Sequence, residues 1–180
     1  MNKKISILSL CIICFLATMN VGAQTTSNSN EEQLDELDNP RFELSINALY
    51  LLLGGFEIRY EHLLSESSSV GALGYYRYDS DFWELKSELS GYYRHYFSRN
   101  YASGFYGEAF VSYNTMDEYY WANRDELSHN FGVGFSFGYK LISKENLLLD
   151  LGLGLGRNII SSKYDDWFFP RINISFGYRF

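Results

Sequence analysis

Apolar residues alternate with other residues along much of this chain, and this alternation limits the possible folds more than any other feature. Residues 147–155 show it most clearly, because every second residue is leucine and Asp150, Gly152 and Gly154 lie between. Successive side chains of a β-strand point to opposite faces, so the pattern predicts a strand with one apolar face. Clusters of Gly, Ser, Asn and Asp separate eight such stretches. The eight stretches are 42–51, 55–63, 70–79, 83–97, 104–114, 129–141, 146–156 and 171–180.

The composition favours strands over helices. Aromatic residues make up 18% of the 180 residues and there are two prolines, a balance that suits half-buried pleated surfaces. The chain is 46% hydrophobic, yet its mean hydropathy is only -0.22, which excludes a bundle of transmembrane helices. The net charge of -7 leaves no basic face for a nucleic-acid partner. We therefore predict an all-β protein that does not bind nucleic acid.

The first 40 residues differ from the rest of the chain. Residues 1–23 combine Lys3 and Lys4 with an apolar stretch and small residues at 21–23, the pattern of a cleaved signal peptide. Both cysteines lie in this segment, so the exported chain is predicted to have neither disulfides nor thiolate chemistry. Residues 24–40 are polar and acidic and are interpreted as a periplasmic tether. Residues 41–180 then form the barrel.

The apolar face of the predicted strands is too large to be an interior. It carries roughly three dozen apolar side chains, whereas the lumen of an eight-stranded barrel is just wide enough for a modest set of side chains. We therefore predict an eight-stranded antiparallel up-and-down transmembrane β-barrel whose apolar side chains face outer-membrane lipid. The alternative is a soluble lipocalin-like barrel with these side chains inside. Its exterior would then carry the glycine-rich runs at 132–138 and 152–156, which is unusual for a surface in water.

The opposite face carries small or charged residues. Away from the ends of the stretches, all charged residues share this inward phase, and seven acids balance seven bases. An isolated charge would be costly both in lipid and in a narrow lumen, so we expect ion pairs that fill the interior and leave no open pore. The acids are Glu43, Glu57, Glu61, Glu84, Glu88, Glu108 and Asp150, and the bases are Arg59, Arg77, Lys86, Arg94, Lys140, Arg171 and Arg179.

The connections predict the orientation of the barrel. Short turns at 65–69, 98–103 and 142–145 are assigned to the periplasmic side, and the long connections 115–128 and 157–170 to the outside. Residues 52–55 are expected to form a tight Gly-Gly hairpin. In this orientation outward-facing aromatic residues, among them Tyr50, form a band near each rim.

The last ten residues carry a family resemblance. The ending Arg-Ile-Asn-Ile-Ser-Phe-Gly-Tyr-Arg-Phe resembles the terminal strand of the small OmpA/OmpX-type outer-membrane barrels, and the resemblance extends over residues 41–180. It implies a location in the outer membrane of a Gram-negative bacterium and recognition by the outer-membrane assembly machinery. The residues 45–50 and 57–61 are also similar to a family of outer-membrane barrels with no assigned function. The implied assembly-signal residues are Ile174, Phe176, Tyr178 and Phe180.

The three histidines do not form a convincing catalytic or metal-binding site in the sequence. Ser128, His129 and the nearby acids Asp125 and Glu126 resemble the serine-histidine site of lipid A deacylases, which makes a lipid-modifying enzyme an alternative function. Adjacent strand residues point to opposite faces, however, so Ser128 and His129 are not expected to meet. Three dispersed histidines without cysteine provide no metal-ligand spacing. We predict a non-enzymatic protein without cofactor or metal.

The two long connections combine acids with flat aromatic rings. This composition suits stacking on sugars or anchoring a protein partner, so we predict a structural or adhesive role with an extracellular protein or glycan as partner. The alternative is that these rings only extend the outer aromatic band. The candidate binding residues are Asp117, Tyr119, Tyr120, Trp121, Tyr164, Asp165, Asp166 and Trp167.

Overall fold

The computed structural model describes residues 40–79, 85–117, 127–161 and 168–180. These residues belong to one compact unit, Pro40–Phe180. The expected signal peptide and nearly all of the tether lie outside the described residues.

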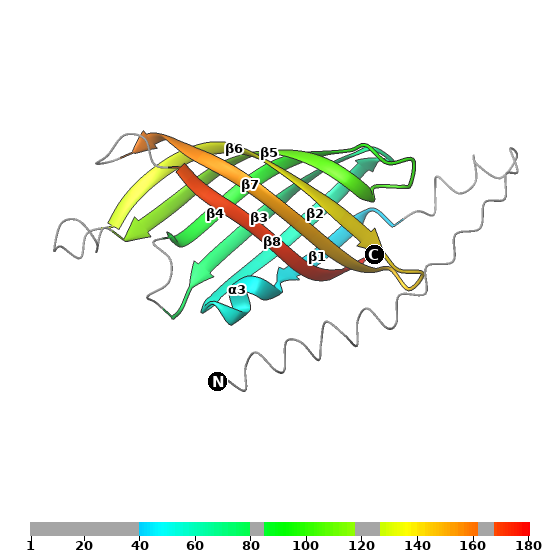
Figure 1. Cartoon of the computed structure of the whole chain (residues 1–180), viewed down its shortest axis with the longest axis horizontal. Coiled ribbons are helices and arrows are strands. Elements are labelled where there is room, and N and C mark those ends of the chain that lie inside the picture. The colour runs from blue at the N-terminus through cyan, green and yellow to red at the C-terminus, as the bar shows by residue number, and fades with distance from the viewer. Residues whose placement is uncertain (1–39, 80–84, 118–126, 162–167) are drawn as a thin grey trace, which may run out of the picture. The chain divides into compact units, whose positions relative to one another are not determined.

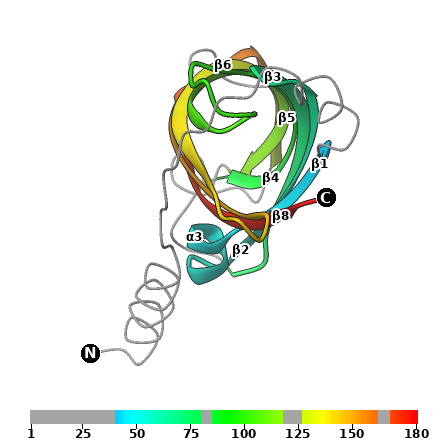
Figure 2. The same cartoon turned by 90° about the vertical axis from the view of Figure 1, so that its right-hand side faces the viewer.

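The described residues form a closed barrel in which each strand pairs with its sequence neighbours and β8 returns to β1 (Figures 1 and 2). All of these pairings are antiparallel. The predicted all-β, eight-stranded, antiparallel up-and-down barrel is therefore confirmed. The elements are β1 (Phe42–Asn47), α3 (Ala48–Leu52), β2 (Gly55–Ser65), β3 (Ser68–Arg77), β4 (Leu85–Tyr96), β5 (Gly104–Asp117), β6 (Leu127–Ile142), β7 (Leu147–Ser161) and β8 (Phe168–Arg179).

The two ends of the barrel differ. One end carries the short connections β2–β3, β4–β5 and β6–β7 together with Phe180, and we call it the turn end. The opposite end carries α3 and the connections β3–β4, β5–β6 and β7–β8, and we call it the α3 end. These groups match the predicted division between short and long connections.

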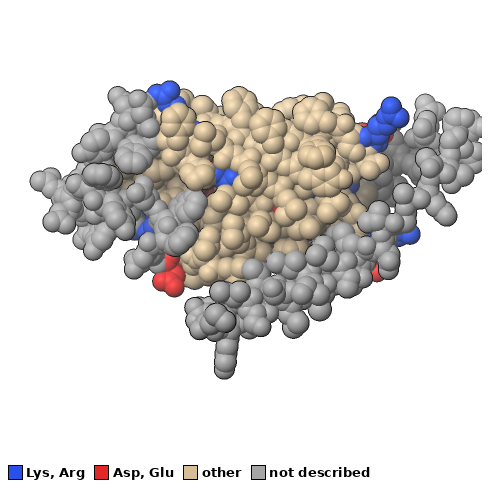
Figure 3. Space-filling model, viewed as in Figure 1, with Lys and Arg blue, Asp and Glu red and all other residues tan. Residues whose placement is uncertain are grey.

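Alternate side chains along the strands face the lumen or the outer surface of the barrel. In β6, Phe135 and Phe137 are 67% and 69% exposed, whereas Ser136 between them is 5% exposed. The pleat turns successive side chains to opposite faces, and the narrow lumen accepts only one of the two sets. Across the middle of the face in Figure 3, the surface is almost wholly uncharged, and charged groups gather toward its ends. The lipocalin-like alternative required the alternating apolar side chains inside, and the structure has them outside.

The first predicted stretch, 42–51, is not one strand. It divides into β1 and the short helix α3, and the expected hairpin at 52–55 is the exit from that helix. The Asn47 side chain accepts a hydrogen bond from the Leu49 N–H at 3.1 Å, which caps the helix. Ala and Leu favour helix, and the alternation ends where three leucines follow one another. Tyr50, predicted to face outward, is consequently turned inward and buried.

Strand ends and one strand face also differ from the prediction. The alternation along 83–97 predicts Leu85 on the apolar outer face, but the β4–β5 register shifts between Leu85 and Ser87, and Leu85 is buried inside. A bulge places an extra residue on one strand and reverses the alternation beyond it, which the local pattern does not reveal. The strands beside the long connections reach farther than predicted, to Asp117 in β5 and Ser161 in β7.

Candidate functional site

The interior of the barrel gathers most of the charged residues that the alternation assigned to it. Eleven of the fourteen are buried, while Arg77 and Lys86 are half-buried. Glu84 lies outside the described residues. The buried acids are Glu43, Glu57, Glu61, Glu88, Glu108 and Asp150, and the buried bases are Arg59, Arg94, Lys140, Arg171 and Arg179.

Glu61 on β2 is the centre of the charged cluster nearer the turn end. Its carboxylate accepts hydrogen bonds from Lys140 Nζ at 2.8 Å and from Arg94 Nη1 at 3.0 Å. The hydroxyls of Ser69 and Tyr96 donate to the same carboxylate at 2.6 and 2.5 Å. Lys140 also reaches Glu43 on β1. One carboxylate therefore ties β2 to β3, β4 and β6.

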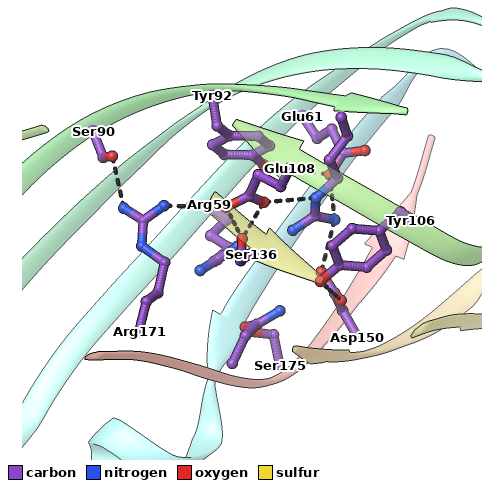
Figure 4. Close-up of polar contacts among 12 residues, drawn as sticks. Arg59, Glu61, Ser90, Tyr92, Tyr106, Glu108, Ser136, Asp150, Arg171 and Ser175 are labelled. Carbon is purple, nitrogen blue, oxygen red and sulfur yellow. Dashed lines mark hydrogen bonds and ion pairs between the residues drawn. The ribbon is translucent and has the colours of Figure 1, made fainter. Parts of the chain in front are cut away.

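Glu108 on β5 is the corresponding centre in the middle of the barrel (Figure 4). It accepts from Arg94 Nε at 2.8 Å and from Arg171 Nη1 at 3.1 Å, and Arg59 Nη1 lies 3.6 Å away. The Ser136 hydroxyl completes its surroundings at 2.8 Å. Arg94 lies beside Glu108 on the paired strand β4, whereas Arg59 on β2 and Arg171 on β8 reach this carboxylate across the lumen. Such a network leaves little room for a solute path.

The turn end is closed by the β4–β5 connection. Ala102 in this turn is fully buried, and its N–H donates to the Glu66 carbonyl at 2.7 Å. Arg179 near the end of β8 donates to the carbonyls of Tyr101 and Ala102 at 3.1 and 2.7 Å. Its Nε also donates to Glu43 at 2.7 Å. The turn thus folds into the end of the barrel and is held there by the last strand (Figure 2).

Large rings also fill the lumen, which sequence reasoning missed. The inward face was expected to be small or charged, but aromatic rings lie on it and rest on glycines of the neighbouring strand. The register of the strands places each ring opposite its glycine. The ring–glycine pairs could therefore be recognised only once the strand pairing was known. The directly paired couples are Tyr92 with Gly71, Tyr106 with Gly138, Phe110 with Gly134 and Phe169 with Gly156.

These rings gather into two groups. Leu63, Tyr96, Ala102 and Tyr106 pack together at the turn end. Toward the α3 end lies a second group, which we call the apolar cluster. Its members are Tyr50, Leu73, Tyr75, Leu85, Tyr92, Phe110 and Phe169, with Met116 packed against them.

The serine and histidine of the enzyme alternative lie on opposite faces of β6. Ser128 is buried and donates to the Asn130 Oδ1 at 2.9 Å. His129 stacks outside on Tyr113, and its Nδ1 lies 3.0 Å from the Tyr113 hydroxyl. Their acidic neighbours at 125 and 126 lie outside the described residues. This geometry does not bring Ser128 and His129 together.

Residues 40–79, 85–117, 127–161 and 168–180 offer neither a cluster of metal ligands nor a helix suited to cross a membrane. No group of three or more His, Cys, Asp or Glu residues in these ranges could hold a metal ion. None of the helices found there is both long and apolar enough to cross a membrane.

The remaining predicted residues fall at the two ends. Asp117 closes β5, where its backbone pairs with Leu127. The other candidate binding residues, at 119–121 and 164–167, lie outside the described residues. Phe180 exchanges backbone hydrogen bonds with Phe42 at 2.7 and 3.3 Å, beside the seam between β8 and β1. The other implied signal residues, Ile174, Phe176 and Tyr178, follow the outward phase of β8.

The fold and its interior define a class: a closed up-and-down β-barrel whose lumen is filled by ion pairs and aromatic rings. Comparison with protein families gives a match over residues 9–175 to the family described as "Protein of unknown function (DUF3575)". The chain belongs to this family. Neither the curated proteins nor the solved structures gave a significant match.

Proposed function

We propose that this protein is an integral outer-membrane barrel of the OmpA/OmpX type that presents its long connections to a partner outside a Gram-negative cell. Its role is structural or adhesive rather than catalytic, and it offers no open pore. The observation that carries the proposal is the segregation of side chains in a closed barrel. Apolar side chains cover the outside, and buried acids and bases pair inside.

The exposed apolar belt is the first support. Phe135, Phe137 and Leu153 are each about two-thirds exposed on neighbouring strands, and similar side chains surround them. Soluble monomers rarely expose a continuous apolar patch larger than a few hundred Å². A lipid environment removes this cost, and a barrel satisfies its backbone hydrogen bonds without water.

The filled lumen is the second support. Ion pairs around Glu61 and Glu108 occupy the middle, and the β4–β5 turn closes one end. Transport through the barrel is therefore disfavoured, and recognition falls to the long connections. Their acids and aromatic rings suit an extracellular protein or a glycan. The terminal strand, with its resemblance to an assembly signal, supports delivery by the outer-membrane assembly machinery.

Membrane location is tested by expressing the full chain in a Gram-negative host and separating the two membranes. We expect the protein in the outer-membrane fraction, resistant to an alkaline carbonate wash and extracted only by detergent. A folded monomer that stays in solution without detergent would overturn the proposal.

The binding role is tested by replacing residues 118–126 or 162–167 with short Gly-Ser linkers. We expect each variant to keep the β-sheet circular dichroism of the parent. Proteins that co-purify with the parent from native outer membranes, or glycans that it binds on an array, should be lost from at least one variant. Retention of all partners by both variants would contradict loop-mediated binding.

A further inference from the structure

Strand pairing does not close the barrel along its full height. β1 pairs with β2 only from Phe42 to Ile46 and with β8 only from Glu43 to Asn47, after which the chain turns into α3. From this point toward the α3 end, no described β1 residue lies between the start of β2 and residues 168–174 of β8. α3 contacts both β2 and β8 there. We call this part of the wall the β2–β8 opening and α3 its cover.

The edge of β8 at the opening is held by side chains instead of a strand. Phe180 and Phe42 exchange backbone hydrogen bonds, so alternate residues of β8 back to Pro170 present their backbone groups to this edge. Pro170 has no N–H to offer, as suits an unpaired edge. The Ile172 carbonyl accepts from Asn47 Nδ2 at 3.0 Å, and the same nitrogen lies 3.1 Å from Glu57 Oε1. One amide thus bridges the opening.

The apolar cluster lies behind the cover. Tyr50 is its only member that comes from α3, and its ring centre lies 4.9 Å from that of Tyr75. The other members stand on strands that remain paired. Movement of α3 away from the wall would withdraw Tyr50 from this cluster, in which the ring centres of Phe110 and Phe169 lie 6.1 Å apart.

In the part of the chain that the structure describes, buried side-chain nitrogens without a hydrogen-bond partner occur on the two strands that flank the opening, and also at His62 Nδ1 nearer the turn end and at Arg94 Nη2 on β4. Arg59 Nη2 on β2, and Arg171 Nε and Asn173 Nδ2 on β8, have no hydrogen-bond partner among the described residues. Arg59 and Arg171 both reach Glu108, which places them side by side (Figure 4). Buried donors normally find an acceptor, so these three point to a missing one. The bases here already have carboxylates, so an uncharged carbonyl suits the site better than an anion.

We propose that the β2–β8 opening admits one acyl chain of a membrane lipid. The chain takes the place of Tyr50 in the apolar cluster, and the ester carbonyl accepts hydrogen bonds from Arg171 and Asn173. Exposed Phe56 and Phe168 on the flanking strands, with Leu51 and Leu52 on α3, continue the apolar outer wall up to the opening. The inference rests on the proposed membrane location, because the lipid enters sideways from the bilayer.

Photolabelling tests both proposals separately. The full barrel is reconstituted in phosphatidylcholine vesicles that contain a phospholipid with a diazirine on one acyl chain, and adducts are mapped by mass spectrometry. We expect adducts on outward Phe137 and Leu153 and also on inward Phe110 and Phe169. Leu63, buried at the turn end, should stay unlabelled. Adducts on outward residues alone would overturn the acyl site but leave the membrane location intact, and no adducts on either face would overturn both.

Two variants test the role of the cover. Tyr50→Ala and Asn47→Ala should each raise labelling of Phe110 and Phe169 several-fold, because one removes the ring that fills the space and the other removes the bridge. Tyr76→Ala, which removes an exposed ring on β3, is the matched control and should leave inward labelling unchanged. Circular dichroism verifies folding of each variant. Unchanged inward labelling in a folded Tyr50→Ala or Asn47→Ala protein would contradict the role of α3 as a cover.

Discussion

The ring of Tyr106 on β5 lies directly on Gly138, its partner on β6. A Cβ atom added to Gly138 would overlap the Tyr106 hydroxyl and ring as well as the carbonyl oxygen of Leu151. The same relationship joins Phe110 to Gly134 four residue pairs along the register. Gly134 and Gly138 of β6 therefore each leave room for one aromatic ring, and their spacing matches that of Phe110 and Tyr106 on β5.

Gly138→Ala should destabilise the barrel, because backbone as well as a side chain stands where the methyl group would go. We expect a loss of about 1–3 kcal/mol in the free energy of unfolding, as for other overpacked sites. Gly91→Ala is the control, since its added Cβ would lie 4.0 Å from the Val111 side chain. Urea titration of the reconstituted proteins measures both, and equal effects would show that Tyr106 does not require the glycine.

Removing the charge of Lys140 should lower the free energy of unfolding more than Gly138→Ala does. Its Nζ contacts the carboxylates of Glu43 and Glu61, and Lys140→Met leaves both with one base fewer in a buried site. Breaking a buried ion pair from one side costs about 3–5 kcal/mol. Lys144→Met, at an exposed turn residue, should change stability by no more than about 0.5 kcal/mol. The same unfolding titration measures both variants. Similar stabilities of Lys140→Met and Lys144→Met would contradict a buried network of ion pairs.

Arg179→Met should release the β4–β5 turn. This arginine holds the carbonyls of Tyr101 and Ala102, and exposed Arg99 in the same connection is a trypsin site. We expect faster cleavage after Arg99 in the variant, because a loosened turn fits a protease better. Cleavage after Lys144 in the β6–β7 turn provides the reference within the same molecule. An unchanged ratio of the cleavage rates after Arg99 and after Lys144 would mean that contacts other than those of Arg179 hold the β4–β5 turn in place.

Leu153→Arg distinguishes a wall that faces lipid from one that faces water. Leu153 is 67% exposed in the middle of β7, and an arginine at the bilayer midplane costs about 2–4 kcal/mol. Leu64→Arg, near the turn end, should cost only about 0–1 kcal/mol because it lies near the membrane interface. Unfolding titrations in phospholipid vesicles measure the difference. A Leu153→Arg protein as stable as the parent would place this face in water.

Local pattern carried the prediction of the fold well wherever pairing stayed regular. Leu147, Leu151, Leu153 and Leu155 are exposed and the acids of β2 are buried, as predicted, because the pleat acts residue by residue, although Leu149 is buried. The prediction was wrong at Tyr50 and Leu85, where a helix and a bulge interrupt the alternation. The helix has local signals in the Asn47 cap and the run of leucines, whereas the bulge depends on pairing with β5, about which a period of two contains no information.

The interior was predictable as a set of residues but not as a site. Phase alone brought Glu61, Lys140 and Arg94 to the lumen, yet their sequence positions do not say which of them meet. That depends on strand register and on which strands face one another across the closed barrel. The pairing of Tyr106 and Phe110 with glycines was missed for the same reason.

The sequence by itself determined that eight strands form, which face of each is apolar and that the charges share the other face, because alternation is a local property of an extended backbone. Only the tertiary structure decided that Glu108 collects three arginines, that Arg179 holds the turn across the lumen, and that α3 covers a wall segment which β1 leaves unpaired. Those relationships arise when the sheet curves and closes, since closure brings residues more than a hundred positions apart within hydrogen-bond distance.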